Sequence, residues 1–260
     1  MFLPFGKSFP LFIHQLCCTK NDIMKKKVLI TGGNKGIGFE TAKQLLAKNY
    51  FVYIGCRDKE KASEALSQLK ALGFNDVEAI ALDVTSEESI KHAAAQIDSL
   101  DVLINNAGIP GSYPQKASET SQENLRNVFD TNFFGLIQTT QAFIPLLKQS
   151  ETPRIVNVSS DLGSLGYHSN PEWEHYDVKL LAYCSSKTAL NAFTVMLAYE
   201  FKDTNFKINS VNPGYTRTEF NNNQGPKPVE EAGELIVKYA ILDDNGPTGK
   251  FFSEGGESPW

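Results

Sequence analysis

The sequence contains no long hydrophobic run and no excess of basic side chains. Its apolar stretches fall short of the roughly 20 residues that a membrane-spanning helix needs, so we expect no membrane partner. The 25 basic and 30 acidic side chains give a net charge of −5 at pH 7, which argues against nucleic acid as a partner. At 260 residues the chain is long enough to bury the core of one α/β domain.

Cysteine is scarce. The four cysteines are Cys17, Cys18, Cys56 and Cys184, of which two are adjacent and two stand far apart. This spacing matches neither a disulfide framework nor a metal site, so we predict no metal. Free thiols are typical of a reducing compartment, and we therefore expect the protein in the cytoplasm.

The first 23 residues differ from the rest of the chain. Their apolar residues are interrupted by Pro4, Lys7 and Pro10, so they lack the unbroken core of about 7–15 apolar residues that a secretory signal needs. Met24 and three lysines then lead straight into an expected strand. We interpret 1–23 as an extension that is disordered or missing from the physiological protein, with Met24 as the natural start. A short surface arm is the alternative, and the folded domain is expected over 24–260.

Strand and helix patterns alternate from residue 28 onward. This alternation predicts a single Rossmann-type, doubly wound parallel sheet with helices on both faces. We expect Thr85 or Ser86 to cap the third helix, Pro145 to disturb the last turn of the longest one, and the polar segment 221–226 to form a mobile loop. The expected strands cover 28–30, 51–54, 77–82, 102–104, 154–158, 207–211 and 249–252, and the expected helices cover 36–48, 59–72, 86–97, 121–147, 180–202 and 229–239.

A glycine-rich turn joins the first expected strand to the first expected helix. Gly32, Gly36 and Gly38 follow Thr31 in the pattern T-G-x-x-x-G-x-G. Glycine lets the backbone turn tightly and approach phosphates without a side chain in the way. The helix N-terminus then faces the negative charge. This turn predicts a binding site for a nucleotide pyrophosphate, although its spacing is not the G-x-G-x-x-G form.

A phenol and an ammonium group share one face of a later helix. Tyr183 and Lys187 are four residues apart, which places them one turn from each other. Free tyrosine has a pKa near 10, and a nearby ammonium stabilises the phenolate and lowers that pKa. Such a tyrosine can protonate a carbonyl oxygen while a hydride reaches the carbon. The pair therefore predicts an enzyme that moves a hydride and a proton together.

Several motifs follow one another along the chain: the glycine turn, Asn105-Asn106-Ala107-Gly108, Asn132, Ser159-Ser160, Tyr183 with Lys187, and Pro213-Gly214 with Thr218. Their order resembles the short-chain dehydrogenase/reductase family. Within that family the chain is most similar to the carbonyl-reductase-like branch, through its glycine turn and the Cys-Arg-Asp that follows the second strand. The resemblance covers 27–260 and identifies 24–260 as an NAD(P)-binding reductase domain.

The resemblance implies a role for each of these residues. Tyr183 is then the general acid, Lys187 tunes it and binds the nicotinamide ribose, and Ser160, in preference to Ser159, holds the substrate oxygen. Asn132 is expected to hold the water chain that resupplies the proton, with backbone bonding inside its helix as the alternative. The expected cofactor contacts are Gly32, Asn34, Lys35, Gly36, Ile37, Gly38, Arg57, Asp83, Val84, Asn105, Ala107, Gly108, Tyr183, Lys187, Pro213, Gly214, Thr216 and Thr218.

The end of the second strand favours NADPH over NADH as the cofactor. An NAD enzyme usually places an acid there to bind the ribose 2′-hydroxyl, whereas this chain has Cys56 followed by Arg57. A guanidinium can hold a 2′-phosphate, and Lys35 adds a second cation. Both cations as solvated surface charges are the alternative, and Asp58 argues against NADPH. We predict NADPH-dependent reduction of an aldehyde or ketone; the alternatives are an NAD-dependent alcohol dehydrogenase and a non-catalytic NADPH sensor.

Two segments bear on the substrate and on assembly. More residues separate Ser160 from Tyr183 than in most of the family, and similar insertions in the carbonyl-reductase-like branch lie over the helix used for tetramer packing. This favours a monomer over a homo-oligomer. Trp173 and Tyr176 in the insertion either wall the substrate pocket or pack the insertion onto the domain. The stretch from Thr218 to Val229 is short for a covering loop, which predicts an open pocket that accepts several small carbonyl compounds.

Overall fold

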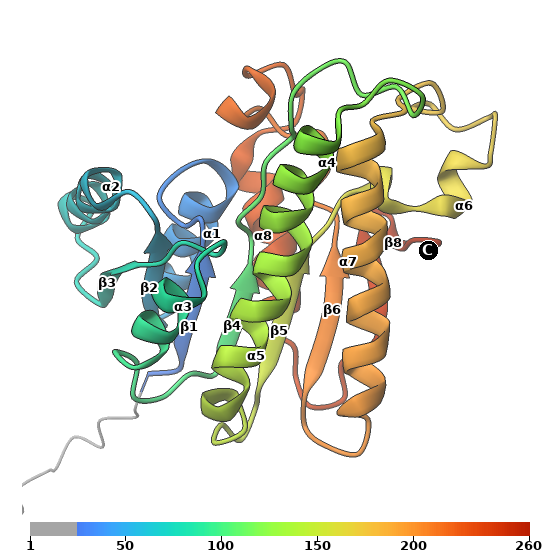
Figure 1. The fold of residues 1–260 in the computed structure, drawn as a ribbon. Helices are drawn as coiled ribbons and strands as arrows, with labels where there is room; N and C mark the ends of the chain where they lie inside the picture. The colour runs from blue at the N-terminus through green and yellow to red at the C-terminus, as the bar shows by residue number, and fades with distance from the viewer. Residues whose placement is uncertain (1–24) are drawn as a thin grey trace, which may run out of the picture.

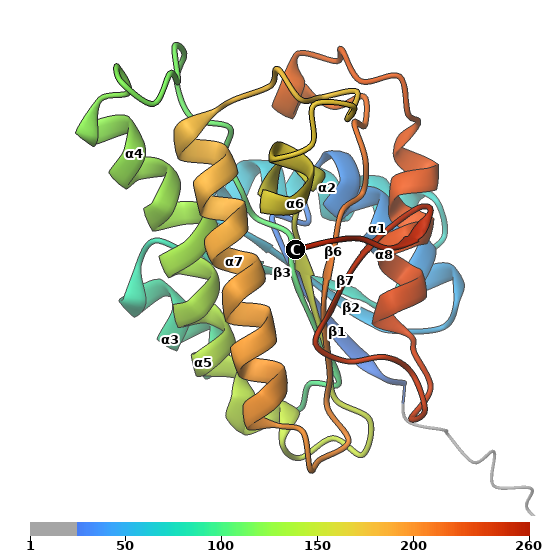
Figure 2. The same ribbon diagram turned by 90° about the vertical axis from the view of Figure 1, so that its right-hand side faces the viewer.

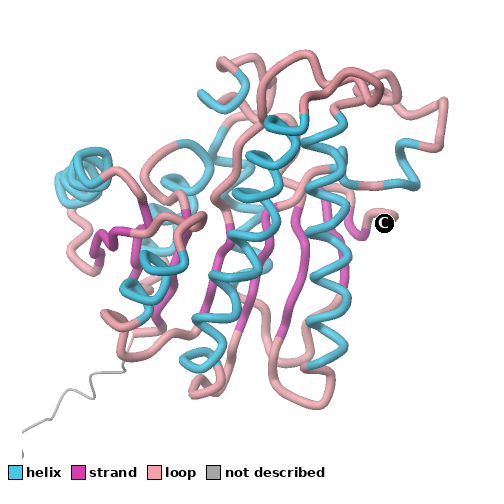
Figure 3. The backbone as a smooth tube through the Cα atoms, viewed as in Figure 1, coloured by secondary structure: helices cyan, strands magenta, loops and turns pink. Residues whose placement is uncertain are grey.

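The computed structural model describes residues 25–260, and the expectation for residues 1–23 lies outside them. Strands and helices alternate along the chain (Figures 1 and 3). The strands are β1 (Lys27–Thr31), β2 (Phe51–Cys56), β3 (Val77–Ala81), β4 (Val102–Asn105), β5 (Arg154–Val158), β6 (Lys207–Val211), β7 (Lys250–Ser253) and β8 (Gly256–Glu257). The α-helices are α1 (Gly36–Ala47), α2 (Lys59–Ala71), α3 (Glu87–Ala94), α4 (Gln122–Phe129), α5 (Gly135–Leu147), α6 (Leu165–His168), α7 (Leu181–Glu200) and α8 (Val229–Ala240).

All eight strands form one sheet in the order β3-β2-β1-β4-β5-β6-β7-β8. Neighbouring strands run parallel, except that β8 returns antiparallel to β7. The order reverses direction at β1 and β4, where the chain crosses from one half of the sheet to the other. Ligands of doubly wound sheets bind at this crossover, outside the carboxyl ends of the strands. The predicted Rossmann-type sheet is confirmed.

Helices cover both faces of the sheet, as Figure 2 shows in the view along the layers. Successive residues of β1 point to opposite faces, since side chains alternate along a strand. Val28 and Ile30 pack with α1, α2 and α8, while Leu29 packs with α3, α5 and α7. All three side chains are fully buried, and each such burial stabilises the fold by about 1.5–3 kcal/mol.

Helix starts follow local capping chemistry. Asp58 accepts hydrogen bonds from two backbone N–H groups of α2, and Ser86 caps α3 through the N–H of Ser89, which decides between the two expected caps. Ser121 caps α4 in the same way through the N–H of Asn124. Each cap contributes about 1 kcal/mol by satisfying a donor that has no partner inside the helix.

The single helix predicted over 121–147 is interrupted. A π-helical turn at Asp130–Phe134 separates α4 from α5, while Pro145 stays inside the last turn of α5 without ending it. A π turn inserts one extra residue and changes which side chains face the core, and such turns are frequent at functional sites. The interruption was not predicted, because the apolar spacing continues through it.

Two short elements were not predicted, and the segment 221–226 was predicted only as a loop. The short elements α6 and β8 carry too few residues for a periodic pattern. The segment 221–226 begins at the 3₁₀ turn Glu219–Asn221 and is held by a hydrogen bond from Asn221 Nδ2 to the Thr216 carbonyl (2.8 Å); its predicted mobility stays a prediction. Among the residues that the structure describes, no helix is both long and apolar enough to cross a membrane.

Candidate active site

The predicted site residues meet at one edge of the sheet, where the parallel strands end. The glycine turn follows β1, Asn106-Ala107-Gly108 follows β4, and Ser159-Ser160 follows β5. The segment from Pro213 to Thr218 follows β6. This common edge explains how residues far apart in sequence come together (Figure 1).

The glycine turn is shaped for close backbone approach. Gly32 and Gly36 have positive φ angles of 64° and 55°, a conformation that side chains strongly disfavour. A Cβ on Gly38 would lie 2.5 Å from the Gly32 carbonyl oxygen and 2.5 Å from Nδ2 of Asn106. Asn34 and Ile37 are half-buried between these glycines. The turn therefore leaves a backbone cradle at the N-terminus of α1, which fits a pyrophosphate.

The segment after β4 braces this turn. Thr31 Oγ1 accepts hydrogen bonds from the N–H groups of Asn106 and Ala107, both at 2.9 Å. Asn106 Nδ2 donates to the carbonyls of Thr31 and Gly32. The cradle is thus built from two strand ends. Asn106 belongs to the motif after β4, and no role was predicted for its side chain.

The cations proposed for the cofactor lie at the same edge, and two carboxylates nearby are engaged. Arg57 is exposed directly after β2. Asp58 Oδ1 accepts from the N–H groups of Glu60 and Lys61, so this carboxylate serves the α2 cap. Lys35 Nζ forms an ion pair with Glu219 Oε2 at 2.6 Å, a contact between the glycine turn and the segment after β6 that the sequence did not predict.

The expected adenine contacts after β3 have local partners. Asp83 Oδ1 accepts from the N–H and the hydroxyl of Thr85 at 2.9 and 2.7 Å, which shapes the turn into α3. Val84 is buried, and its carbonyl oxygen would lie 2.7 Å from a Cβ on Gly135. Gly135 thus allows α5 to start directly against this strand end.

Tyr183 and Lys187 lie together on α7, as the helical spacing predicted. Lys187 Nζ is 5.9 Å from the centre of the Tyr183 ring and donates to the Val158 carbonyl at 2.7 Å. The ring of Phe220 covers the phenol, with centroids 5.8 Å apart. Lys187 is buried and Tyr183 is half-buried. The phenol therefore lies where α7 meets the segment after β6, and it remains partly exposed.

Burial governs the ionisation of both groups. Desolvation lowers the pKa of Lys187 to about 8. Desolvation raises the pKa of Tyr183, and the Ser160 hydroxyl, which hydrogen-bonds the phenol, opposes this shift only in part. Burial is the largest cause of this shift, so the Tyr183 pKa lies above its ordinary value, whereas the helical spacing with Lys187 predicted a lowered one. A protonated phenol at neutral pH is the form that donates a proton.

The two serines after β5 have different surroundings. Ser159 is buried and donates its hydroxyl hydrogen to Asn191 Oδ1 at 2.7 Å. Ser160 is half-buried and lies beside the phenol of Tyr183. Asp161 follows, and its carboxylate accepts from Ser253 Oγ on β7 at 2.7 Å; burial raises the pKa of Asp161. Of the two serines, the structure leaves Ser160 facing the reactive pair.

Asn132 occupies the π turn and is fully buried. Its Oδ1 accepts from the Ile109 N–H at 2.8 Å, and its Nδ2 donates to the Ile109 carbonyl at 3.0 Å. It also donates to Ser186 Oγ on α7. A Cβ on Gly108 would lie 3.3 Å from Asn132 Oδ1 and 3.7 Å from Lys187 Nζ, so these three residues adjoin. The Asn132 amide therefore binds backbone groups, but they belong to the distant loop at Ile109 and not to its own helix, as the alternative to the water-chain role had expected.

Asn105 points into the core instead of toward the cradle. Its Nδ2 donates to Thr140 Oγ1 and to Asn157 Oδ1, both at 2.9 Å. Asn157 in turn donates to Thr194 Oγ1 on α7 at 2.8 Å. This buried polar chain ties β4 and β5 to α5 and α7, so Asn105 supports the helices that carry the site. A cofactor contact through its side chain finds no support in this orientation.

The segment after β6 lies against the glycine turn. Thr218 Cγ2 would be 3.4 Å from a Cβ on Gly36. Gly214 has a φ of 83° and donates its N–H to Asn212 Oδ1 at 3.0 Å. Thr216 is buried, and its hydroxyl donates to the Gly214 carbonyl, while Pro213 is buried at the end of β6. Thr218 thus borders the cradle, and the other three predicted cofactor residues lie in the same segment.

The insertion between Ser160 and Tyr183 packs onto itself. Trp173 stacks on Tyr167 with ring centres 5.2 Å apart and meets His168 and His175 edge-on. Lys179 lies over the ring of Tyr176 at 4.1 Å. Trp173 therefore stabilises the insertion. In residues 25–260 no group of three or more His, Cys, Asp or Glu side chains could hold a metal ion.

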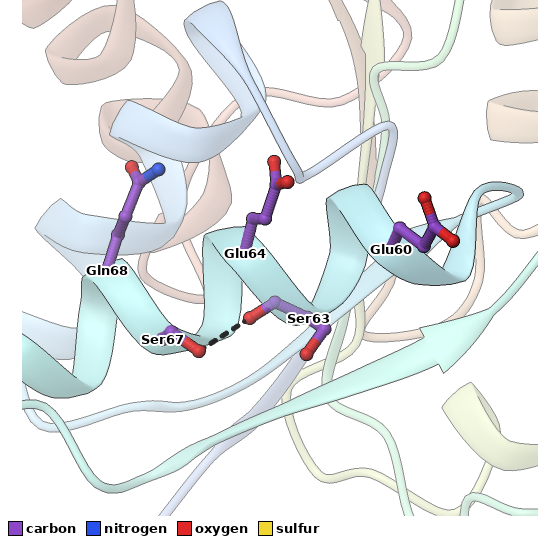
Figure 4. Close-up of a pocket in the computed structure, with 5 residues that line it drawn as sticks. All are labelled: Glu60, Ser63, Glu64, Ser67 and Gln68. Atoms are coloured by element: carbon purple, nitrogen blue, oxygen red, sulfur yellow. Dashed lines mark hydrogen bonds between the residues drawn. The ribbon is translucent and has the colours of Figure 1, made fainter.

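A shallow hollow lies elsewhere, along the exposed side of α2 (Figure 4). Its lining is Glu60, Ser63, Glu64, Ser67 and Gln68, and Ser67 donates to the Ser63 carbonyl within the helix. Two carboxylates make it unsuited to a phosphate, and α2 stands at the edge of the sheet remote from α7 (Figure 1). The predicted site residues lie instead at the strand ends.

Comparisons with known proteins agree with this geometry. The family model described as short chain dehydrogenase matches residues 26–228, and the chain belongs to this family of oxidoreductases. The short-chain dehydrogenase anuI of Penicillium roqueforti is 40% identical over 228 residues, covering 84% of this chain and 89% of that protein. Salutaridine reductase of Papaver somniferum is 32% identical over 299 aligned positions, covering 89% and 96%.

Solved structures show the same fold. The structure of salutaridine reductase from Papaver somniferum matches with a TM-score of 0.79 and 31% identity, over 88% of this chain and all (100%) of that one. The NADPH-bound carbonyl reductase from chicken fatty liver matches with a TM-score of 0.78 and 26% identity, over 91% and 99%. The predicted family is therefore confirmed, and its carbonyl reductases are among the structures that this chain resembles.

Proposed function

We propose that this chain is an NADPH-dependent reductase that converts an aldehyde or ketone to an alcohol. The observation that carries the proposal is the grouping of Tyr183, Ser160 and Lys187 beside a backbone cradle at the N-terminus of α1. NADPH, when bound, supplies the hydride. The relatives that support this substrate class are a salutaridine reductase and a carbonyl reductase bound to NADPH.

The chain's own residues then handle the proton and the oxygen. Tyr183, protonated through burial, donates its proton to the carbonyl oxygen as negative charge develops there. The Ser160 hydroxyl donates a hydrogen bond to the same oxygen and holds it in place. Lys187, fixed by the Val158 carbonyl, stabilises the phenolate that remains. Asn132 holds the backbone of Ile109 and adjoins Lys187 across Gly108, and we assign it to the relay that resupplies the proton.

The residues after β2 support NADPH over NADH. An NAD enzyme usually has a free carboxylate here for the ribose hydroxyls. In this chain the Asp58 carboxylate caps α2, and Cys56 is buried. Arg57 is exposed at this place and can pair with a 2′-phosphate. We expect Arg57→Asp to weaken NADPH use at least about tenfold, because one carboxylate–phosphate repulsion replaces an ion pair, and to improve NADH use. An unchanged ratio of the two cofactors would contradict this assignment.

The direct test follows nicotinamide absorbance with purified protein, NADPH or NADH, and a panel of aldehydes, ketones and quinones. We expect turnover with NADPH on several unrelated carbonyls. Tyr183→Phe should lose nearly all turnover, a fall of about 100-fold or more for a missing general acid, and keep its affinity for NADPH. Turnover with NADH alone would support the alcohol dehydrogenase alternative, and tight NADPH binding with no turnover on any carbonyl would support a sensor.

Substrate breadth, location and assembly are further parts of the proposal. The alignment to salutaridine reductase is longer than the 260 residues of this chain, so that relative has segments that this chain lacks, which supports an open pocket. Cys56 and Cys184 are free and buried, in keeping with a cytoplasmic protein. The insertion was expected to cover the helix used for tetramer packing, but Val195, Met196 and Tyr199 on α7 are exposed. The insertion therefore gives no reason to favour a monomer over a homo-oligomer, and light scattering would measure the oligomeric state.

A further inference from the structure

The N-terminus of α7 has no cap of its own. The helix begins at Leu181, and the preceding Leu180 has no side-chain oxygen to bind the first N–H groups. These groups have no partner within a helix and must be satisfied from outside. Tyr183 lies in this first turn. The catalytic phenol is thus attached to the part of the helix that depends most on contacts from elsewhere.

Gln115 supplies the missing cap from a distant loop. Its backbone carbonyl accepts from the Leu181 N–H at 2.9 Å, and its side-chain Oε1 accepts from the Tyr183 N–H at 3.1 Å. The side chain is only 3% exposed, although Gln115 lies 68 positions before Tyr183. One residue therefore satisfies two of the first three N–H groups of the helix.

Gln115 is itself held in place. Its Nε2 donates to the Pro110 carbonyl at 2.7 Å, so both ends of the amide are used. The same loop is fixed at Ile109 by Asn132, and at Ser112 by both polar ends of the Asn124 side chain, each at 2.8 Å. The loop from Ile109 to Gln115 thus links the π turn to the start of α7.

We propose that Gln115 is a positioning residue that sets the place of Tyr183 at the active site; its consequence for turnover rests on the proposed reductase function. The second turn of α7 has a separate anchor, because Lys187 donates to the Val158 carbonyl. Loss of the Gln115 bond should therefore move the phenol without moving the lysine. A misplacement of about 1 Å in a reacting group can lower a rate by about 100-fold.

Three variants test this assignment. Gln115→Met keeps the size of the side chain and removes both polar ends. Gln115→Glu at pH 6 carries a buried carboxyl that is neutral through desolvation; its carbonyl can accept from Tyr183 and its hydroxyl can donate to Pro110. Asn124→Ala is the matched control for loosening the loop. The Asn124 side chain binds Ser112 on the same loop and forms no hydrogen bond to α7.

The first readout is amide hydrogen exchange at Tyr183, measured by NMR on the full chain without substrate. We expect exchange about tenfold faster or more in Gln115→Met, and rates within about threefold of the original in Gln115→Glu and Asn124→Ala, because only the first variant loses an acceptor for this N–H. Unchanged exchange in Gln115→Met would overturn the cap. This readout needs no turnover, so it remains decisive if the reductase proposal fails.

The second readout is steady-state kinetics with NADPH and a carbonyl substrate that the unmodified protein reduces. Gln115→Met should lower kcat by about 10- to 100-fold, with KM for the carbonyl and the Kd of NADPH within about threefold. Gln115→Glu at pH 6 should restore kcat to within about threefold, and Asn124→Ala should keep it. An equal loss in Asn124→Ala, or a loss carried by KM and Kd alone, would reduce Gln115 to a loop anchor and overturn the proposal.

Discussion

We expect the buried charge of Lys187 to lower the free energy of unfolding of the protein without cofactor. Substitution of Lys187 by an apolar residue should therefore raise it. The ammonium group is buried, and the Val158 carbonyl is the acceptor of its hydrogen bond within residues 25–260. Desolvation lowers its pKa from 10.5 to about 8. At about 1.4 kcal/mol for each pKa unit, this shift corresponds to a destabilisation of about 3 kcal/mol when the lysine is charged.

The sign of the pH dependence follows from the direction of the shift. In the unfolded chain Lys187 keeps its proton up to about pH 10.5, whereas in the folded protein it loses the proton near pH 8. Between these values the unfolded state binds more protons, so the free energy of unfolding rises with pH. The cost is present in full below about pH 8 and disappears as the pH approaches 10.5.

The test compares Lys187→Met with the unmodified protein by urea unfolding without cofactor at pH 7, 8.5 and 10. Methionine keeps the apolar stem, and the lost bond to Val158 offsets the gain by about 1 kcal/mol. We expect the variant to be more stable by about 2 kcal/mol at pH 7, and this advantage should shrink steadily toward pH 10. Lys202→Met, an exposed lysine just beyond α7, gives the baseline for loss of a positive charge.

A difference in unfolding free energy that stays constant from pH 7 to pH 10 would refute the reasoning, since a merely structural lysine contributes no pH-dependent term. The same variant should lose reductase turnover. Stability gained together with activity lost is the pattern of a residue retained for function at a cost to the fold.

Two further predictions concern ion pairs at opposite ends of the sheet. Glu219→Gln should tighten NADPH binding several-fold at low salt, because Lys35 is then free for a phosphate. Fluorescence titration would show it, and a variant that binds NADPH no more tightly than the unmodified protein at low salt would contradict it. Arg154→Met should destabilise the protein by about 3 kcal/mol in urea unfolding, because the buried guanidinium binds three backbone carbonyls and Asp244. A loss under about 1 kcal/mol would show that these carbonyls find other partners.

Local patterns were enough for the elements of the fold. Strand β1 needed only its apolar run, and α2 only its apolar spacing, since short-range backbone preferences act within one or two turns. The same holds for the pairing of Tyr183 with Lys187, which follows from helical period alone. The glycine turn was readable because Gly32 and Gly36 adopt a conformation that few other residues accept.

Contacts between distant segments were not readable in this way. The cap on α7 joins residues 68 positions apart, and the Lys35–Glu219 ion pair joins residues 184 positions apart. The inward orientation of Asn105 depends on Thr140 and Asn157, which the sequence does not place beside it. Such contacts depend on how the layers pack, and no local preference encodes them.

The sequence by itself determined the class of fold, the family, the candidate acid, the lysine beside it and the glycine turn, because each of these depends on residue type and short spacing. Only the tertiary structure decided how they are used. It turned Asn105 into the core, placed Asn132 in a π turn against Ile109, and buried Tyr183 enough to raise its pKa where its lysine neighbour predicted the opposite. Desolvation depends on everything packed around a group, so it appears only when the fold is complete.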